Sequence, residues 1–100
     1  AGESLRTRAE ATGTYEAAVN AYEVWRQARA AAASMDRTAA MMSKAYAAGE
    51  ADLNQLLLAR RQAVEATLAA RLAQADARER HLRLLLDAHR LWALDDDTAM

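Results

Sequence analysis

The chain has 100 residues, of which 28 are alanine and 13 are leucine, and it contains no proline, cysteine, isoleucine or phenylalanine. Alanine, leucine, arginine and glutamate favour helices because they lose little side-chain freedom there, so the composition predicts an all-α fold. The 13 basic and 14 acidic residues give a formal charge of -1. This balance predicts no attraction to nucleic acid and no basic face toward anionic lipid. The absence of cysteine excludes disulfides, thiolate metal sites and thiol catalysis.

The first predicted helix runs from Ser4 or Thr14 to Ala48. Both starts stay open, because Gly13 is compatible with the beginning of a helix and with a bend inside one. Gly49 is the only glycine after Gly13, and it suits the left-handed conformation that closes a helix. We therefore predict a turn at residues 49–52.

The second predicted helix runs from Leu53 to about Leu94. Asp52 is placed to cap it, with Gln55 at the reciprocal position of a capping box. Residues 95–100 are expected to fray, because their aspartates oppose the helix dipole. The sequence thus predicts a single domain, a long antiparallel, coiled-coil-like helical hairpin that dimerises into a four-helix bundle when isolated.

Apolar residues in both segments alternate at spacings of three and four, the pattern of helices that wrap around each other. The stripe predicted to form the seam comprises Tyr15, Val19 and Tyr22, then, after a change of phase near Trp25, Ala28, Ala32, Met35, Ala39, Met42 and Tyr46, and on the second helix Leu53, Leu57, Val64, Leu68, Leu72, Ala75, Leu82 and Leu86. Leucines near the second helix's end face several directions, so a single partner helix does not cover them. We expect self-association through faces that include Leu82, Leu85, Leu86 and Trp92.

The segment from Tyr46 to Arg60 resembles the hairpin tip of TolC-like outer-membrane efflux channels, the outer membrane factors. In that family a long helix ends in tyrosine, two residues and glycine, and the return helix opens with a leucine-rich segment. Tyr46, Gly49, Leu57 and Ala59 match these positions, and Arg60 stands where glutamine is common. The start of the second helix looks closest to the heavy-metal-efflux branch. The chain departs from the pattern at residues 95–97, where aspartates replace the family's usual glycines.

The resemblance implies a non-catalytic hairpin in the periplasm, as part of an outer-membrane protein whose three subunits form a helical tunnel. It also implies that the tip binds a periplasmic adaptor protein through Tyr46, Ala48, Gly49, Glu50, Asp52 and Leu53. The alternative is a free-standing coiled-coil hairpin that serves as a structural or protein-interaction module. No cofactor is expected in either case.

Candidate chemical sites have simpler interpretations. His81 and His89 lie eight residues apart, about 12 Å along one helix, which is too far for both to bind one metal ion within a chain. Met35 and Met42 lie about 10 Å apart and are interpreted as packing residues rather than copper ligands. The serines lie in no nucleophile motif, and no glycine-rich loop exists to hold phosphate. We therefore predict neither a catalytic nor a metal site.

Overall fold

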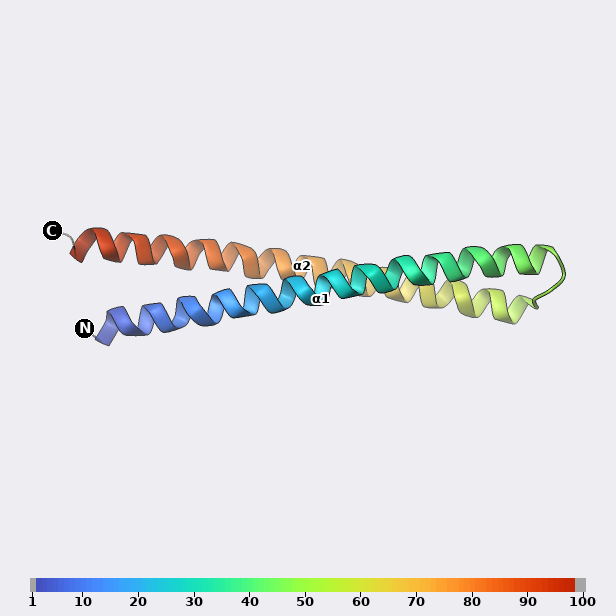
Figure 1. Cartoon of the computed structure of the whole chain (residues 1–100), viewed down its shortest axis with the longest axis horizontal. Helices are drawn as coiled ribbons and strands as arrows, with labels where there is room; N and C mark the ends of the chain where they lie inside the picture. Colours follow the sequence, from blue (N-terminus) through green and yellow to red (C-terminus); the bar gives the residue numbers. More distant parts are fainter. Residues whose placement is uncertain (1, 99–100) are drawn as a thin grey trace.

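The computed structural model describes residues 2–98, which form two helices joined by a turn. Helix α1 spans Gly2–Ala47 and helix α2 spans Leu53–Thr98. The helices lie side by side and antiparallel, with both chain ends at one end of the molecule and the turn at the other (Figure 1). The hairpin measures 76 × 17 × 12 Å. The predicted all-α hairpin is confirmed.

The helix ends differ from the prediction. Helix α1 already begins at Gly2 and passes through Gly13 without a break. Helix α2 is longer than predicted and continues past Leu94 to Thr98. No glycine or proline follows Leu94 to stop the helix, and Asp95 forms an ion pair of 3.9 Å with Arg8 of the other helix. Residues 99 and 100 lie outside the described part of the chain.

The turn closes both helices through hydrogen bonds of the backbone and one capping pair. Gly49 has a φ of 77°, its N–H donates to the Tyr46 carbonyl at 3.0 Å, and the N–H of Glu50 donates to the Ala45 carbonyl at 2.8 Å. This is the Schellman arrangement of a helix C-terminus. On the other side, the N–H of Gln55 donates to Asp52 Oδ1 at 2.8 Å and the N–H of Asp52 donates to Gln55 Oε1 at 2.9 Å. The predicted glycine stop and capping box are both confirmed.

The seam between the helices is built mainly from alanine. Its positions follow an unbroken alternation of three and four residues, as in a coiled coil. The buried or partly buried residues at these positions are Ala11, Thr14, Ala18, Ala21, Trp25, Ala28, Ala32, Ala39 and Met42 on α1, and Leu56, Ala59, Ala63, Ala66, Ala70, Ala73, Ala77, Leu84, Asp87, Leu91 and Leu94 on α2.

The predicted seam is therefore wrong for all of its α2 residues and for the first part of α1, and Met35 and Tyr46 of the second part are exposed as well. Tyr15, Val19 and Tyr22 are exposed, and so is every α2 residue predicted to lie in the seam, from Leu53 to Leu86. No change of phase occurs at Trp25, which is itself a seam residue. The distance between two helices depends on the side chains at their contact, and the alanine stripes allow a close approach. The larger residues then remain on the outside.

Candidate functional site

The turn gathers the six residues predicted to bind an adaptor. Tyr46, Ala48, Gly49, Glu50, Asp52 and Leu53 all lie at the end of the hairpin opposite the chain termini, and all six are exposed. We call this group the tip (Figure 1). The sequence placed them together correctly because they are neighbours in the chain.

Most of the polar groups of the tip that could bind a partner already form hydrogen bonds within the hairpin. The N–H groups of Ala48, Gly49 and Glu50 donate to carbonyls of α1, and the Asp52 carboxylate caps α2. The groups of the tip that are left to contact a partner are side chains: the carboxylate of Glu50, the ring of Tyr46 and the apolar side chain of Leu53. The tip suits a small contact made by side chains.

A row of leucines runs along the outer side of α2, and three of them, Leu68, Leu82 and Leu86, also line grooves between the helices. These residues occupy the two heptad positions opposite the seam positions, and each is more than half exposed. We call this row the leucine edge; it comprises Leu58, Leu68, Leu72, Leu82 and Leu86. Leu85 and Trp92, which were predicted to take part in self-association, lie beside this edge and are also exposed.

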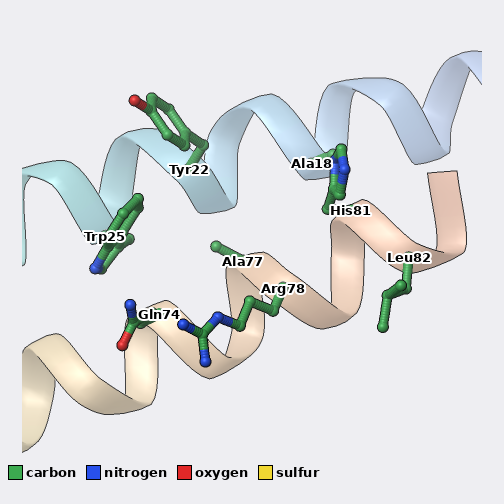
Figure 2. Close-up of a pocket in the computed structure, with 8 residues that line it drawn as sticks. All are labelled: Ala18, Tyr22, Trp25, Gln74, Ala77, Arg78, His81 and Leu82. Atoms are coloured by element: carbon green, nitrogen blue, oxygen red, sulfur yellow. The ribbon is translucent and has the colours of Figure 1, made fainter. Parts of the chain in front are cut away.

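One of the two broad faces of the hairpin carries most of the aromatic residues. Three grooves between the helices open on it: Tyr15 lines the groove nearest the chain ends, Tyr22 and Trp25 line the middle groove, and Val64 and Leu68 line the groove nearest the tip. We call this surface the aromatic face. The middle groove has a volume of about 450 Å³, and Figure 2 shows the Trp25 ring pointing from α1 toward α2.

The opposite face carries a groove near the chain ends. Glu10, Ala17, Arg83, Leu86 and Asp87 are among its lining residues. It lies at the same level of the hairpin as the groove lined by Tyr15, yet the two grooves share no residue. The groove is lined by no tyrosine or tryptophan. The two broad faces are thus chemically different.

Each face has arginines with and without a carboxylate partner: Arg8 pairs with Asp95 on the aromatic face, and Arg83 of the opposite groove has no carboxylate within 4 Å among the described residues. Arg80 and Arg90, which line the opposite groove, form ion pairs with Asp76 at 3.4 Å and Asp87 at 3.6 Å. On the aromatic face, the described residues provide no carboxylate within 4 Å of Arg29, Arg71 or Arg78. Arg78 and Arg71 line its grooves.

Arg29 lies over the Trp25 ring, with Cζ 5.0 Å from the ring centroid. Arg29 and Arg78 thus bring two positive charges to the middle of the aromatic face.

Tyr22 and Trp25 form an edge-to-face pair with centroids 5.6 Å apart and an interplanar angle of 71°. Next to them, Arg26 donates to both carboxylate oxygens of Glu23, at 3.1 and 2.7 Å. These hydrogen bonds lower the pKa of Glu23 and raise the pKa of Arg26. Arg26 thus has its own carboxylate partner, unlike Arg29 and Arg78.

The histidines and methionines do not form a cluster. His81 lines the middle groove beside Arg78, and His89 is exposed eight residues later. Met42 is partly buried in the seam, whereas Met41 is exposed. Among residues 2–98, no group of three or more histidine, aspartate or glutamate side chains is arranged to hold a metal ion.

The sequence reasoning missed the aromatic face because it assigned Tyr15, Val19 and Tyr22 to the seam. The regular spacing of the alanines could have revealed it, because it assigns the seam to the alanines and leaves the rings of Tyr15 and Tyr22 on one side of α1. Neither of the described helices is long and apolar enough to cross a membrane. No known family model matches the chain, and no curated protein or solved structure is detectably similar to it.

Proposed function

We propose that the hairpin forms part of the wall of a helical tunnel in an outer-membrane efflux channel, and that its tip binds a periplasmic adaptor. This is a non-catalytic role in transport, and it follows the resemblance of Tyr46, Gly49, Leu57 and Ala59 to the tip of TolC-like proteins. The heavy-metal-efflux branch of that family is the closest in pattern.

The leucine edge is the observation that carries this proposal. A hairpin 12 Å thick is a single layer of two helices, and a tunnel wall is such a layer continued sideways. Leu58 and Leu72, which line none of the grooves described above, present exposed apolar side chains on the outer side of α2, where the next helix of a wall would lie. A helix with apolar residues on more than one side has more than one neighbour.

The tip supports the second part of the proposal. Its side chains Tyr46, Glu50 and Leu53 are exposed at the far end of a 76 Å arm, which is the position for contact with a protein beyond the end of the tunnel. The contact of a single tip would be small and weak, and several copies in an assembled channel would strengthen it.

A photo-crosslinking amino acid in place of Leu53, in cells that make the protein from its own gene, tests this proposal. We expect a cross-link to a periplasmic adaptor and recovery of the protein with the outer membrane. The same amino acid at Gln62, which is exposed nine positions after Leu53 and about 14 Å further along α2, serves as the control and should give no adaptor product. Equal products from both positions, or recovery from the cytosol, would contradict the proposal.

Two variants test efflux in the same cells. Leu53→Asp should abolish efflux while the protein level stays normal, because it alters the contact surface of the tip. Gly49→Trp should abolish efflux both by adding a ring to the tip and by straining the turn, since Gly49 has a positive φ. Normal efflux with either variant would remove that residue from the site. A double variant, His81→Ala with His89→Ala, should leave efflux unchanged, and a loss would restore a metal role for the histidines.

A second candidate is a free-standing hairpin that pairs with another copy through the leucine edge, and the exposed area favours it. The chain exposes 7755 Å², whereas a compact monomer of 10.9 kDa exposes about 5,600 Å². The excess is larger than the roughly 800 Å² that each partner buries in a typical interface. Sedimentation equilibrium of the isolated chain tests this candidate: a dimer that Leu72→Glu dissociates supports it, and a strict monomer at high concentration excludes it.

A further inference from the structure

We propose that the aromatic face binds an amphipathic helix of a partner protein whose apolar stripe is flanked by carboxylates. This inference is independent of the proposed channel role, because it concerns neither the tip nor an adaptor. It rests on the line of three grooves on this face, on its aromatic side chains, and on Arg29 and Arg78 at the middle groove, which have no carboxylate partner among the described residues.

The shape of the face fits a helix. Its three grooves follow one another along the hairpin, from the level of Tyr15 to the level of Asp36. These residues are 21 positions apart on α1, about 32 Å, which is the length of three heptads. A helix laid along this line would place apolar side chains in each groove, as in helix-in-groove recognition.

The chemistry of the face matches that of binding surfaces. Tryptophan, tyrosine and arginine dominate the residues that contribute most to protein–protein affinity. The middle groove brings all three together, with Tyr22, Trp25 and Arg78 on its walls and Arg29 over Trp25. The opposite groove has arginines but no aromatic residue, so the two faces are not equivalent docking surfaces.

The charge of the face determines which helix it selects. Arg29, Arg71 and Arg78 have no carboxylate partner among the described residues. A partner with carboxylates beside its apolar stripe would supply them. Complementary charge of this kind increases the rate and specificity of association.

The same charge disfavours a second copy of the chain as the occupant. In a two-fold dimer each surface patch meets itself, so face-to-face packing centred on the middle groove would place Arg29 and Arg78 close to their own symmetry mates. Like charges at such close range oppose association. A partner of opposite charge fits the face better.

The direct test uses two synthetic 21-residue helical peptides with the same leucine stripe, one flanked by glutamate and the other by lysine. Fluorescence anisotropy of the labelled peptides, titrated with the 100-residue chain, reports binding. We expect the glutamate peptide to bind, its affinity to fall as salt is raised, and the lysine peptide not to bind. Equal binding of both peptides, or of neither, overturns the proposal without any variant of the chain.

Matched variants locate the binding surface. Arg78→Glu should weaken binding of the glutamate peptide by about tenfold or more, and Arg83→Glu, on the opposite groove, should change it by less than about twofold. Tyr22→Ala should weaken binding, and Val24→Ala should not, since Val24 lies one heptad after Ala17 of the opposite groove. Circular dichroism checks that each variant remains helical. Equal effects within a pair place the peptide elsewhere and overturn the proposal.

The same set of variants distinguishes two other possible partners of the aromatic face, a membrane surface and a second copy of the chain. Sedimentation of the chain with anionic lipid vesicles, lost in Arg78→Glu but not in Arg83→Glu, together with no peptide binding, would assign the face to a membrane surface. Dimerisation that Tyr22→Ala abolishes would assign it to a second copy. Either result overturns the proposal.

Discussion

The closed end and the open end of the hairpin are held together in different ways. Near the turn, the seam buries Leu56, Ala59 and Ala63, and the turn itself satisfies its backbone groups. Toward the chain ends, no described residue before Ala18 on α1 or after Ala63 on α2 is buried.

Polar contacts take over at the open end. The Thr14 hydroxyl donates to Asp87 Oδ2 across the seam at 2.6 Å. Local backbone geometry and one large side chain therefore fix the closed end, whereas the open end depends on contacts for which water competes. Hydrogen exchange should be slowest around residues 56–63 and fastest toward both chain ends, because local openings follow the density of buried contacts.

The largest effect should come from removing Leu56, the most deeply buried large side chain among the described residues of the seam. Leu56 is 4% exposed, and Leu56→Ala should destabilise the hairpin by about 2–3 kcal/mol, the lower part of the range for buried leucines. Leu58→Ala is the control, because Leu58 is 56% exposed and should cost well under half as much. Urea denaturation measures both. Equal losses would mean that the closed end does not depend on the seam.

The turn supplies the next largest effect. Gly49 has a positive φ, so Gly49→Ala should cost about 1–2 kcal/mol, because an L side chain is strained there. Gly13 is helical, and an added Cβ would meet nothing within 4 Å. Gly13→Ala should therefore stabilise the chain by about 0.5–1 kcal/mol. Thermal unfolding of both variants should show opposite shifts, and shifts of the same sign would contradict the conformation of one glycine.

The sequence predicted the turn and not the seam, and the physical reason lies in the range of the signals. Gly49, Asp52 and Gln55 act through hydrogen bonds to near neighbours, so a few adjacent residues determine the geometry. Which stripe faces the other helix depends on a comparison between large and small side chains along all of α1 and α2. Large apolar residues usually fill a core, yet here the alanines do, which leaves the rings of Tyr15 and Tyr22 outside.

The tip and the aromatic face illustrate the same limit. Six residues next to one another in the chain could be assigned to one site because they share a turn. Trp25 and Arg78 are 53 positions apart and meet only once the register of the two helices is known. The net charge of the chain did not indicate the positive charge beside Trp25 either. The acidic residues that balance the total include Asp76 and Asp87, which pair with Arg80 and Arg90 at the opposite groove.

A smaller effect is expected at the open end, where the Thr14–Asp87 pair occupies the seam. Thr14→Val should cost about 0.5–1.5 kcal/mol, because it removes a hydrogen bond to a partly buried carboxylate. Adding Asp87→Leu should recover the loss, since replacing both partners by apolar groups is close to neutral. Urea denaturation of the single and double variants checks this. A double variant less stable than Thr14→Val would show that Asp87 contributes through Arg90 instead.

The smallest effect concerns Glu23, in the middle of α1, whose pKa is lowered chiefly by hydrogen bonds from Arg26. A carboxyl group with a lowered pKa in the folded state stabilises that state above the ordinary glutamate pKa, about 4.3. This contribution is lost as the pH falls through the lowered value. Nearly half of the Glu23 side chain is exposed, so water screens the pair and the change in stability should be slight. Carbon NMR of the Glu23 carboxyl gives a more sensitive reading: Arg26→Gln should raise the pKa of Glu23 toward its ordinary value. Arg29→Gln should leave that pKa unchanged, because Arg29 lies over Trp25 and donates no hydrogen bond to Glu23. A titration curve that Arg26→Gln does not move would show that the pair is not formed in solution, and Arg26 would then join Arg29 and Arg78 as an unpaired cation beside the middle groove.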